Sequence, residues 1–130
     1  MNHDRTEVWN TNTRLLDAPA LEVVARLMIA ARRSLHTTLP SELIPDPALD
    51  VLLQLFLAEV RKERIEPQRL ATVIPGPMTS FNRWAAALVQ YGLIDRNESG
   101  FGLTADGRSK MIQTLRAVVD SQSHTDTVTV

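Results

Sequence analysis

Cysteine is missing from the 130-residue sequence, and the three histidines lie far apart. The absence of cysteine excludes disulfide bonds, zinc ribbons and a thiol nucleophile. His3, His36 and His124 have no second ligand at the spacing of a helical zinc site, and the sequence has no glycine-rich phosphate-binding loop. We therefore expect no metal, no other cofactor and no enzymatic activity.

Long apolar runs are also missing. No segment reaches the ~18 uninterrupted apolar residues of a membrane span; the nearest run, residues 51–58, is short and contains Gln54. The first residues, MNHDRTEVWNTN, lack the basic patch and apolar run of a signal peptide. We therefore expect a cytoplasmic protein without a membrane partner.

A large excess of one charge is missing as well, because the net charge is −1. This value excludes a strongly basic nucleic-acid coat but not a local basic region. Residues 61–110 contain eight basic and five acidic side chains, whereas residues 1–60 contain five basic and eight acidic ones. Residues 61–110 thus have the local positive charge that phosphate binding requires.

The length suits one domain at the usual ~100–200 residues per domain. A helix is predicted from about residue 18 to residue 39, where Pro40 ends it. Its apolar side chains recur at three- and four-residue spacings: Leu21, Val24, Ala25, Met28, Ala31 and Leu35. Further apolar residues widen this surface beyond one stripe: Ala20, Val23, Leu27, Ile29 and Ala30. In so small a chain, such a helix predicts a partner chain, which we take to be a second copy.

The middle of the chain has the order of a helix-turn-helix. An apolar helix is predicted over residues 48–63, followed by a short helix over residues 67–73. The sequence Pro75-Gly76-Pro77 must interrupt the helical path. A further helix is predicted from residue 78 to residue 91, and two helices joined by such a break are typical of the motif.

A small hairpin is predicted after this helix. Gly92 ends the helix, and residues 93–96 and 101–103 form two short strands around the turn residues Asn-Glu-Ser-Gly. Thr104 then caps a closing helix that reaches about Asp120.

Several of these segments together resemble the winged helix-turn-helix of MarR-type transcriptional regulators. They are Thr79-Ser80-Phe81-Asn82-Arg83-Trp84, Leu88, Gly92-Leu93-Ile94-Asp95-Arg96 and Leu103-Thr104-Ala105-Asp106-Gly107-Arg108. In that family, the second helix of the motif leads through Gly-Leu-Ile/Val into the wing, and the return strand ends in Leu-Thr-x-x-Gly. The resemblance covers about residues 49–115.

The resemblance implies a mainly α fold with a small β-hairpin wing, in which the N- and C-terminal helices form a dimerisation region. We expect a flexible arm over residues 1–16, one winged-helix domain over residues 17–120 and a flexible tail over residues 121–130. Within the domain, residues 17–39 and 104–120 would form the dimerisation helices and residues 47–103 the DNA-binding core. The implied partners are a second copy, double-stranded DNA with a near-palindromic operator, and a small-molecule effector.

Candidate DNA contacts lie mainly on the helix predicted over residues 78–91. Arg83 could contact guanine bidentately, and Asn82 could pair with adenine. Thr79 and Ser80 could bind phosphate beside free backbone amides, although ordinary helix initiation is an alternative. Two further arginines could contact the DNA backbone, namely Arg69 in the preceding helix and Arg96 in the hairpin. A salt bridge to Glu66 or Asp95 is the alternative role for Arg83.

Two features depart from the family pattern. The hairpin turn contains Glu98 and no lysine or arginine between Asn97 and Gly102, whereas family members commonly have an arginine at the wing tip. Ala85-Ala86-Ala87 leaves the middle of the reader helix poor in polar groups. The leading hypothesis is a dimeric, sequence-specific DNA-binding transcriptional regulator. The alternative is a winged-helix module that binds another protein and no DNA.

Overall fold

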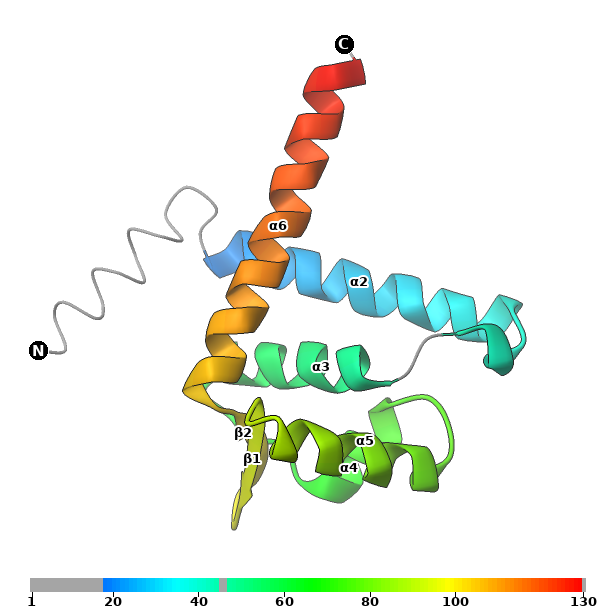
Figure 1. The fold of residues 1–130 in the computed structure, drawn as a ribbon, viewed down its shortest axis with the longest axis vertical. Helices are drawn as coiled ribbons and strands as arrows, with labels where there is room; N and C mark the ends of the chain where they lie inside the picture. Colours follow the sequence, from blue (N-terminus) through cyan, green and yellow to red (C-terminus); the bar gives the residue numbers. More distant parts are fainter. Residues whose placement is uncertain (1–17, 45–46, 130) are drawn as a thin grey trace, which may run out of the picture.

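The computed structural model describes residues 18–44 and 47–129, so the predicted arm over residues 1–16 lies outside the described part (Figure 1). The elements follow in the order α2 (Ala18–Thr38), η1 (Ser41–Leu43), α3 (Ala48–Val60), α4 (Pro67–Val73), α5 (Met78–Gln90), β1 (Ile94–Asn97), β2 (Gly100–Leu103) and α6 (Ala105–Thr129). This part of the chain is mainly helical with a two-stranded hairpin, as predicted. No helix within it is long and apolar enough to cross a membrane.

Helix α3 lies at the centre of the molecule, between α2 on one side and α4, α5 and the hairpin on the other (Figure 1). It packs against α2, α5, α6 and β2. The reason is its sequence, ALDVLLQLFLAEV, which is apolar on nearly all sides and must be covered on all of them. Its buried apolar residues are Val51, Leu53, Leu55, Phe56, Leu57 and Ala58.

A buried ion pair joins α2 to α3. The Arg32 guanidinium donates through Nε to Asp50 Oδ1 at 2.6 Å and through a terminal nitrogen to Oδ2 at 3.0 Å. Asp50 is only 5% exposed, and its side chain belongs to the first turn of α3. Two parallel charge-assisted hydrogen bonds constrain the direction of both side chains. The pair therefore fixes how the first helix lies on the central one.

The end of α2 corrects one sequence prediction. Leu21 and Ala25 are fully buried, as their spacing predicts, but Ala31 and Leu35 on the same predicted face are exposed. They follow Leu27 at four-residue intervals and lie with it on the exposed face of α2.

Two helices end at other residues than the sequence predicted. Helix α3 ends at Val60 instead of residue 63, because Lys62 adopts a left-handed conformation with φ of 59°. Helix α6 continues to Thr129, past the predicted end at about Asp120, so residues 121–129 are helical. No glycine or proline follows Gly107, and a helix that is already nucleated extends at little cost through such a sequence.

Candidate nucleic-acid interface

The turn between α4 and α5 is set by its prolines and glycine. Both helices have the predicted bounds to within one residue. Gly76 has φ of 107°, a conformation that side-chain-bearing residues rarely adopt, and Pro77 precedes α5 with an extended ψ of 155°. The helical path is therefore interrupted between α4 and α5, as the sequence predicted.

Helix α5 has a buried face and an exposed polar face. Phe81, Ala85 and Leu88 are buried at three- and four-residue spacings, and Trp84 is half-buried beside them. The opposite side consists of exposed residues, as the periodicity predicted: Thr79, Asn82, Arg83, Ala86 and Gln90. The core thus determines which side chains the helix presents to solvent.

The hairpin is joined to the segment that follows α3. Strands β1 and β2 pair antiparallel, with Arg96 opposite Phe101. Phe101 also exchanges two backbone hydrogen bonds with Ile65, of 3.0 and 2.8 Å. Gly100, with φ of 113°, passes so close to the Ile65 carbonyl that an added Cβ would lie 2.6 Å from its carbon. A glycine is therefore required where the hairpin meets residue 65.

Arg64 holds the hairpin in place and is not free to bind a ligand. Its Nε and a terminal nitrogen donate to the Gly100 carbonyl at 3.2 and 2.9 Å. The same nitrogen forms an ion pair with the Asp95 carboxylate. The Asp95 carboxylate is therefore paired with Arg64. The alternative role considered for Arg83, a salt bridge to Asp95, is not found in the structure.

Aromatic contacts connect the hairpin to α5. The Phe81 and Phe101 rings meet edge to face, with centroids 6.4 Å apart and an interplanar angle of 82°. The guanidinium of Arg96 lies over the Phe101 ring at 5.4 Å from its centroid. Because Phe101 touches both, Arg96 is positioned beside α5.

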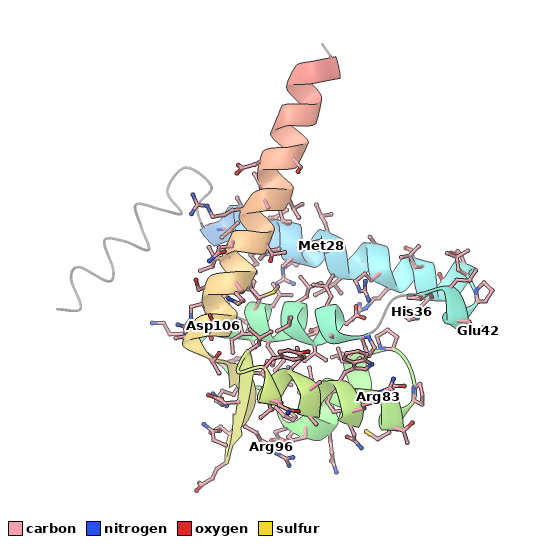
Figure 2. The ribbon with its side chains drawn as sticks, viewed as in Figure 1. Met28, His36, Glu42, Arg83, Arg96 and Asp106 are labelled. Atoms are coloured by element: carbon pink, nitrogen blue, oxygen red, sulfur yellow. The ribbon has the colours of Figure 1, made fainter. Side chains whose placement is uncertain are left out.

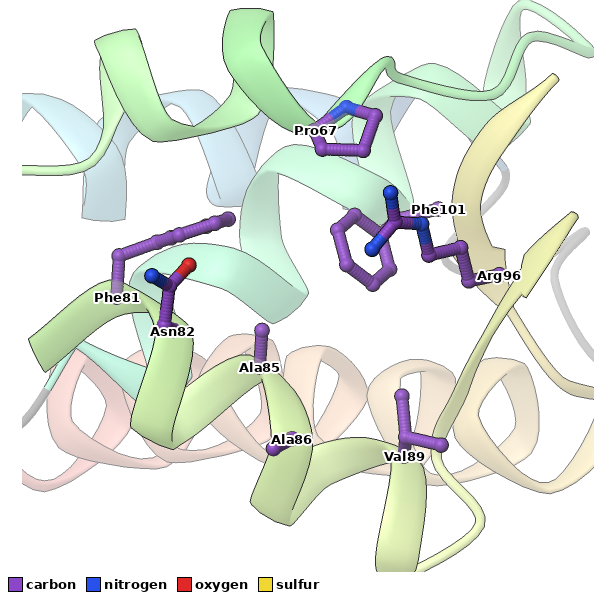
Figure 3. A pocket seen from close by; sticks show the side chains of 8 residues that line it. All are labelled: Pro67, Phe81, Asn82, Ala85, Ala86, Val89, Arg96 and Phe101. Carbon is purple, nitrogen blue, oxygen red and sulfur yellow. The ribbon is translucent and has the colours of Figure 1, made fainter. Parts of the chain in front are cut away.

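A groove of about 450 Å³ lies between α5 and the hairpin (Figure 3). Its lining includes two of the predicted site residues, Asn82 from α5 and Arg96 from β1. The remaining lining residues are apolar: Pro67, Phe81, Ala85, Ala86, Val89 and Phe101. The structure therefore brings Asn82 and Arg96 to one surface depression that contains no carboxylate.

The three predicted site arginines are exposed. Arg69, Arg83 and Arg96 have no carboxylate partner among the described residues. Arg83 lies over its neighbour Trp84, with its guanidinium carbon 5.5 Å from the ring centroid. Arg83 and Arg96 both lie in the part of the molecule that is remote from α2 (Figure 2).

The other basic residues of the 61–110 region are mostly neutralised within the chain. Ion pairs join Arg61 to Glu63, Arg64 to Asp95, Arg108 to Glu59 and Lys110 to Asp106. These pairs leave Lys62 and the three site arginines as the cations of the region without a described carboxylate partner.

The hydroxyl residues lie in the first turn of α5. Thr79 is exposed and Ser80 is half-buried, and neither side chain hydrogen-bonds to a described residue. The N-cap position is Pro77, which provides no side-chain cap, and the first intrahelical bond runs from Phe81 N to the Pro77 carbonyl. The amides of residues 78–80 therefore point out of the helix without an intrahelical acceptor.

Sequence reasoning missed the apolar part of this surface. Val89 is 43% exposed and lines the groove together with Ala86, which lies one turn beyond Asn82. The spacing 82, 86 and 89 follows one helix face and could have indicated it. Among the described residues, no three His, Cys, Asp or Glu side chains are grouped closely enough to hold a metal ion.

No family model matches the chain, and neither a curated protein nor a solved structure matches it.

Proposed function

We propose that the protein is a cytoplasmic, dimeric winged helix-turn-helix regulator that binds double-stranded DNA sequence-specifically. The observation that carries this proposal is the exposed polar face of α5, which includes Arg83; Arg69 on α4 and Arg96 on β1 are exposed as well, and none of the three has a carboxylate partner among the described residues. The order of α3, α4, α5 and hairpin supports it as well, because this is the order of the motif.

In the proposed complex, α5 enters the major groove and the hairpin lies along the backbone. Arg83 and Asn82 reach base edges, since Arg suits guanine and Asn suits adenine. Arg96 on the hairpin and Arg69 on α4 neutralise phosphates of the DNA backbone. Thr79 binds phosphate together with the free amides of the first turn.

The proposed dimer uses the first helix. Val23, Leu27, Ala31 and Leu35 follow one another at four-residue intervals on α2 and are all exposed, Leu27 to 64%. A row of exposed apolar side chains along one helix is typical of an interface. Two copies joined there would present two α5 helices to two half-sites about one helical turn apart.

Replacing Arg83 with alanine tests the proposed reader. We expect Arg83→Ala to weaken binding to the gene's own upstream DNA by about 10- to 100-fold, because a bidentate base contact is lost. Fluorescence anisotropy across a salt series measures the effect. Arg33→Ala removes another exposed arginine, on α2, and serves as the matched control, with unchanged affinity expected.

Equal affinity of Arg83→Ala and the wild type would eliminate Arg83 as a reader. Failure of the wild-type protein to bind any duplex even at low salt would favour the alternative, a winged-helix module that binds another protein. The exposed Glu98 in the hairpin turn supports that alternative, since a carboxylate at the tip of the hairpin repels phosphate.

A further inference from the structure

Part of the surface that the proposed function places against DNA is apolar. Of the three consecutive alanines in α5, Ala85 is buried and Ala87 is half-buried, whereas Ala86 is exposed. Ala86 and Val89 line the groove together with Asn82 (Figure 3). The alanine run therefore contributes one methyl group to the exposed face of α5, and Val89 extends this apolar surface.

The chemistry of the major groove restricts what such a surface can recognise. Every base pair presents hydrogen-bonding groups there, but only thymine adds an apolar group, its C5 methyl. The side chains of Ala86 and Val89 cannot hydrogen-bond to guanine or cytosine and would leave those groups without a partner. Their favourable contact is the thymine methyl.

Asn82 adds a matching polar contact at a suitable distance. Its amide can donate to and accept from adenine, the base that pairs with thymine. Asn82 and Ala86 are four residues apart, or about 6 Å along the helix at 1.5 Å per residue. Successive base pairs are about 3.4 Å apart, so the two contacts fall within about two base pairs of each other.

Charge around the groove suits the same occupant. Arg96 forms part of the groove wall, Arg83 follows Asn82 on α5, and no lining residue is acidic. We propose that α5 reads a short A·T run, with adenine bound by Asn82 and a neighbouring thymine methyl held against Ala86 and Val89. This inference rests on the proposed DNA-binding function and specifies its target.

Four synthetic duplexes of about 30 base pairs, long enough for two half-sites, test it. They are alternating A·T, the same duplex with deoxyuridine for thymidine, alternating G·C, and the G·C duplex with 5-methylcytosine. Deoxyuridine removes the methyl and keeps the base pairing, whereas 5-methylcytosine adds a methyl at the equivalent position. We expect affinity to fall about fourfold for each thymine methyl that Ala86 and Val89 contact, as for one buried CH₂ group, and to rise when cytosine is methylated.

The double variant Ala86→Ser/Val89→Ser should abolish the difference between the thymidine and deoxyuridine duplexes. Ala105→Ser, an exposed alanine of α6, is the matched control and should retain the difference. Circular dichroism and thermal melting establish that each variant is folded.

Equal, salt-dependent binding of all four duplexes by the wild type would overturn this inference and leave the proposed function intact. Discrimination against uracil that persists in the double variant would also overturn it, because other groups would then sense the methyl. Absence of binding to every duplex would overturn both proposals.

Discussion

At the scale of single residues, the arginines fall into two groups. Those of the first group are bound to a carboxylate or a backbone carbonyl of the described residues, and those of the second group are not. Arg32 is bound to Asp50, and Arg64 is bound to Asp95 and the Gly100 carbonyl, so their guanidinium groups hold elements together. Arg83 and Arg96 lie over aromatic rings instead and keep their hydrogen-bond donors available to solvent. A guanidinium over a ring retains its charge and can still contact phosphate or a base.

The buried pair between α2 and α3 gives a stability prediction. We expect Asp50→Ala to lower the free energy of unfolding by about 3 kcal/mol, because Arg32 would remain largely buried without its carboxylate. Glu22→Ala breaks the exposed pair with Arg26 and should cost less than about 0.5 kcal/mol. Urea unfolding followed by circular dichroism measures both, and similar losses in the two variants would contradict this account.

At the scale of elements, the hairpin depends on contacts with distant segments. Two strands alone are marginally stable in water. Here the backbone of Ile65 pairs with that of Phe101, and the Phe81 ring of α5 packs against the Phe101 ring. Thr104 then accepts a hydrogen bond from the Gly107 amide at 2.9 Å, which caps α6 directly after the hairpin as the sequence predicted.

Two glycines with similar φ angles allow a matched test of hairpin docking. Gly76→Ala places a side chain at φ of 107° with no atom within 4 Å, so only backbone strain of about 1–2 kcal/mol is expected. Gly100→Ala places one at φ of 113° against the Ile65 carbonyl and should cost clearly more. Thermal melting compares them, and equal losses would show that the contact with Ile65 yields easily.

At the scale of the whole molecule, the exposed apolar residues of α2 lie apart from the site arginines Arg83 and Arg96. The exposed apolar residues of α2 are on one side of α3, whereas α4, α5 and the hairpin are on the other (Figure 1). A dimer formed through α2 would therefore leave both basic surfaces accessible. In the proposed complex, the modest positive excess in residues 61–110 would make DNA binding by one copy weak, so we expect two copies to bind DNA far better than one.

Replacing Leu27 with glutamate tests this arrangement. We expect Leu27→Glu to be a folded monomer with weakened DNA binding, because a charge would occupy the centre of the proposed interface. Tyr91→Glu, at a side chain that is 78% exposed after α5, is the control and should remain a dimer. Light scattering at micromolar concentration measures the mass. A monomeric wild type, or a dimeric Leu27→Glu variant, would rule out the proposed interface.

Much of the secondary structure could be predicted from local sequence. The bounds of α4 and α5, the hairpin, and the exposed face of α5 with Asn82 and Arg83 were correct. The prolines, glycines and apolar spacing that determine them act within a few residues. The ends of α3 and α6 could not be predicted, since no local signal such as proline fixes either of them.

The sequence by itself determined the order of the elements and which faces of the helices are apolar, because backbone preferences and periodicity are local. Only the tertiary structure decided which cations lack a carboxylate partner. Arg64 meets Asp95 across 31 positions and Arg108 meets Glu59 across 49. Such pairs form only after α3, the hairpin and α6 have packed together. The apolar groove beside Asn82 and Arg96 has the same origin, since its walls come from segments that only folding brings together.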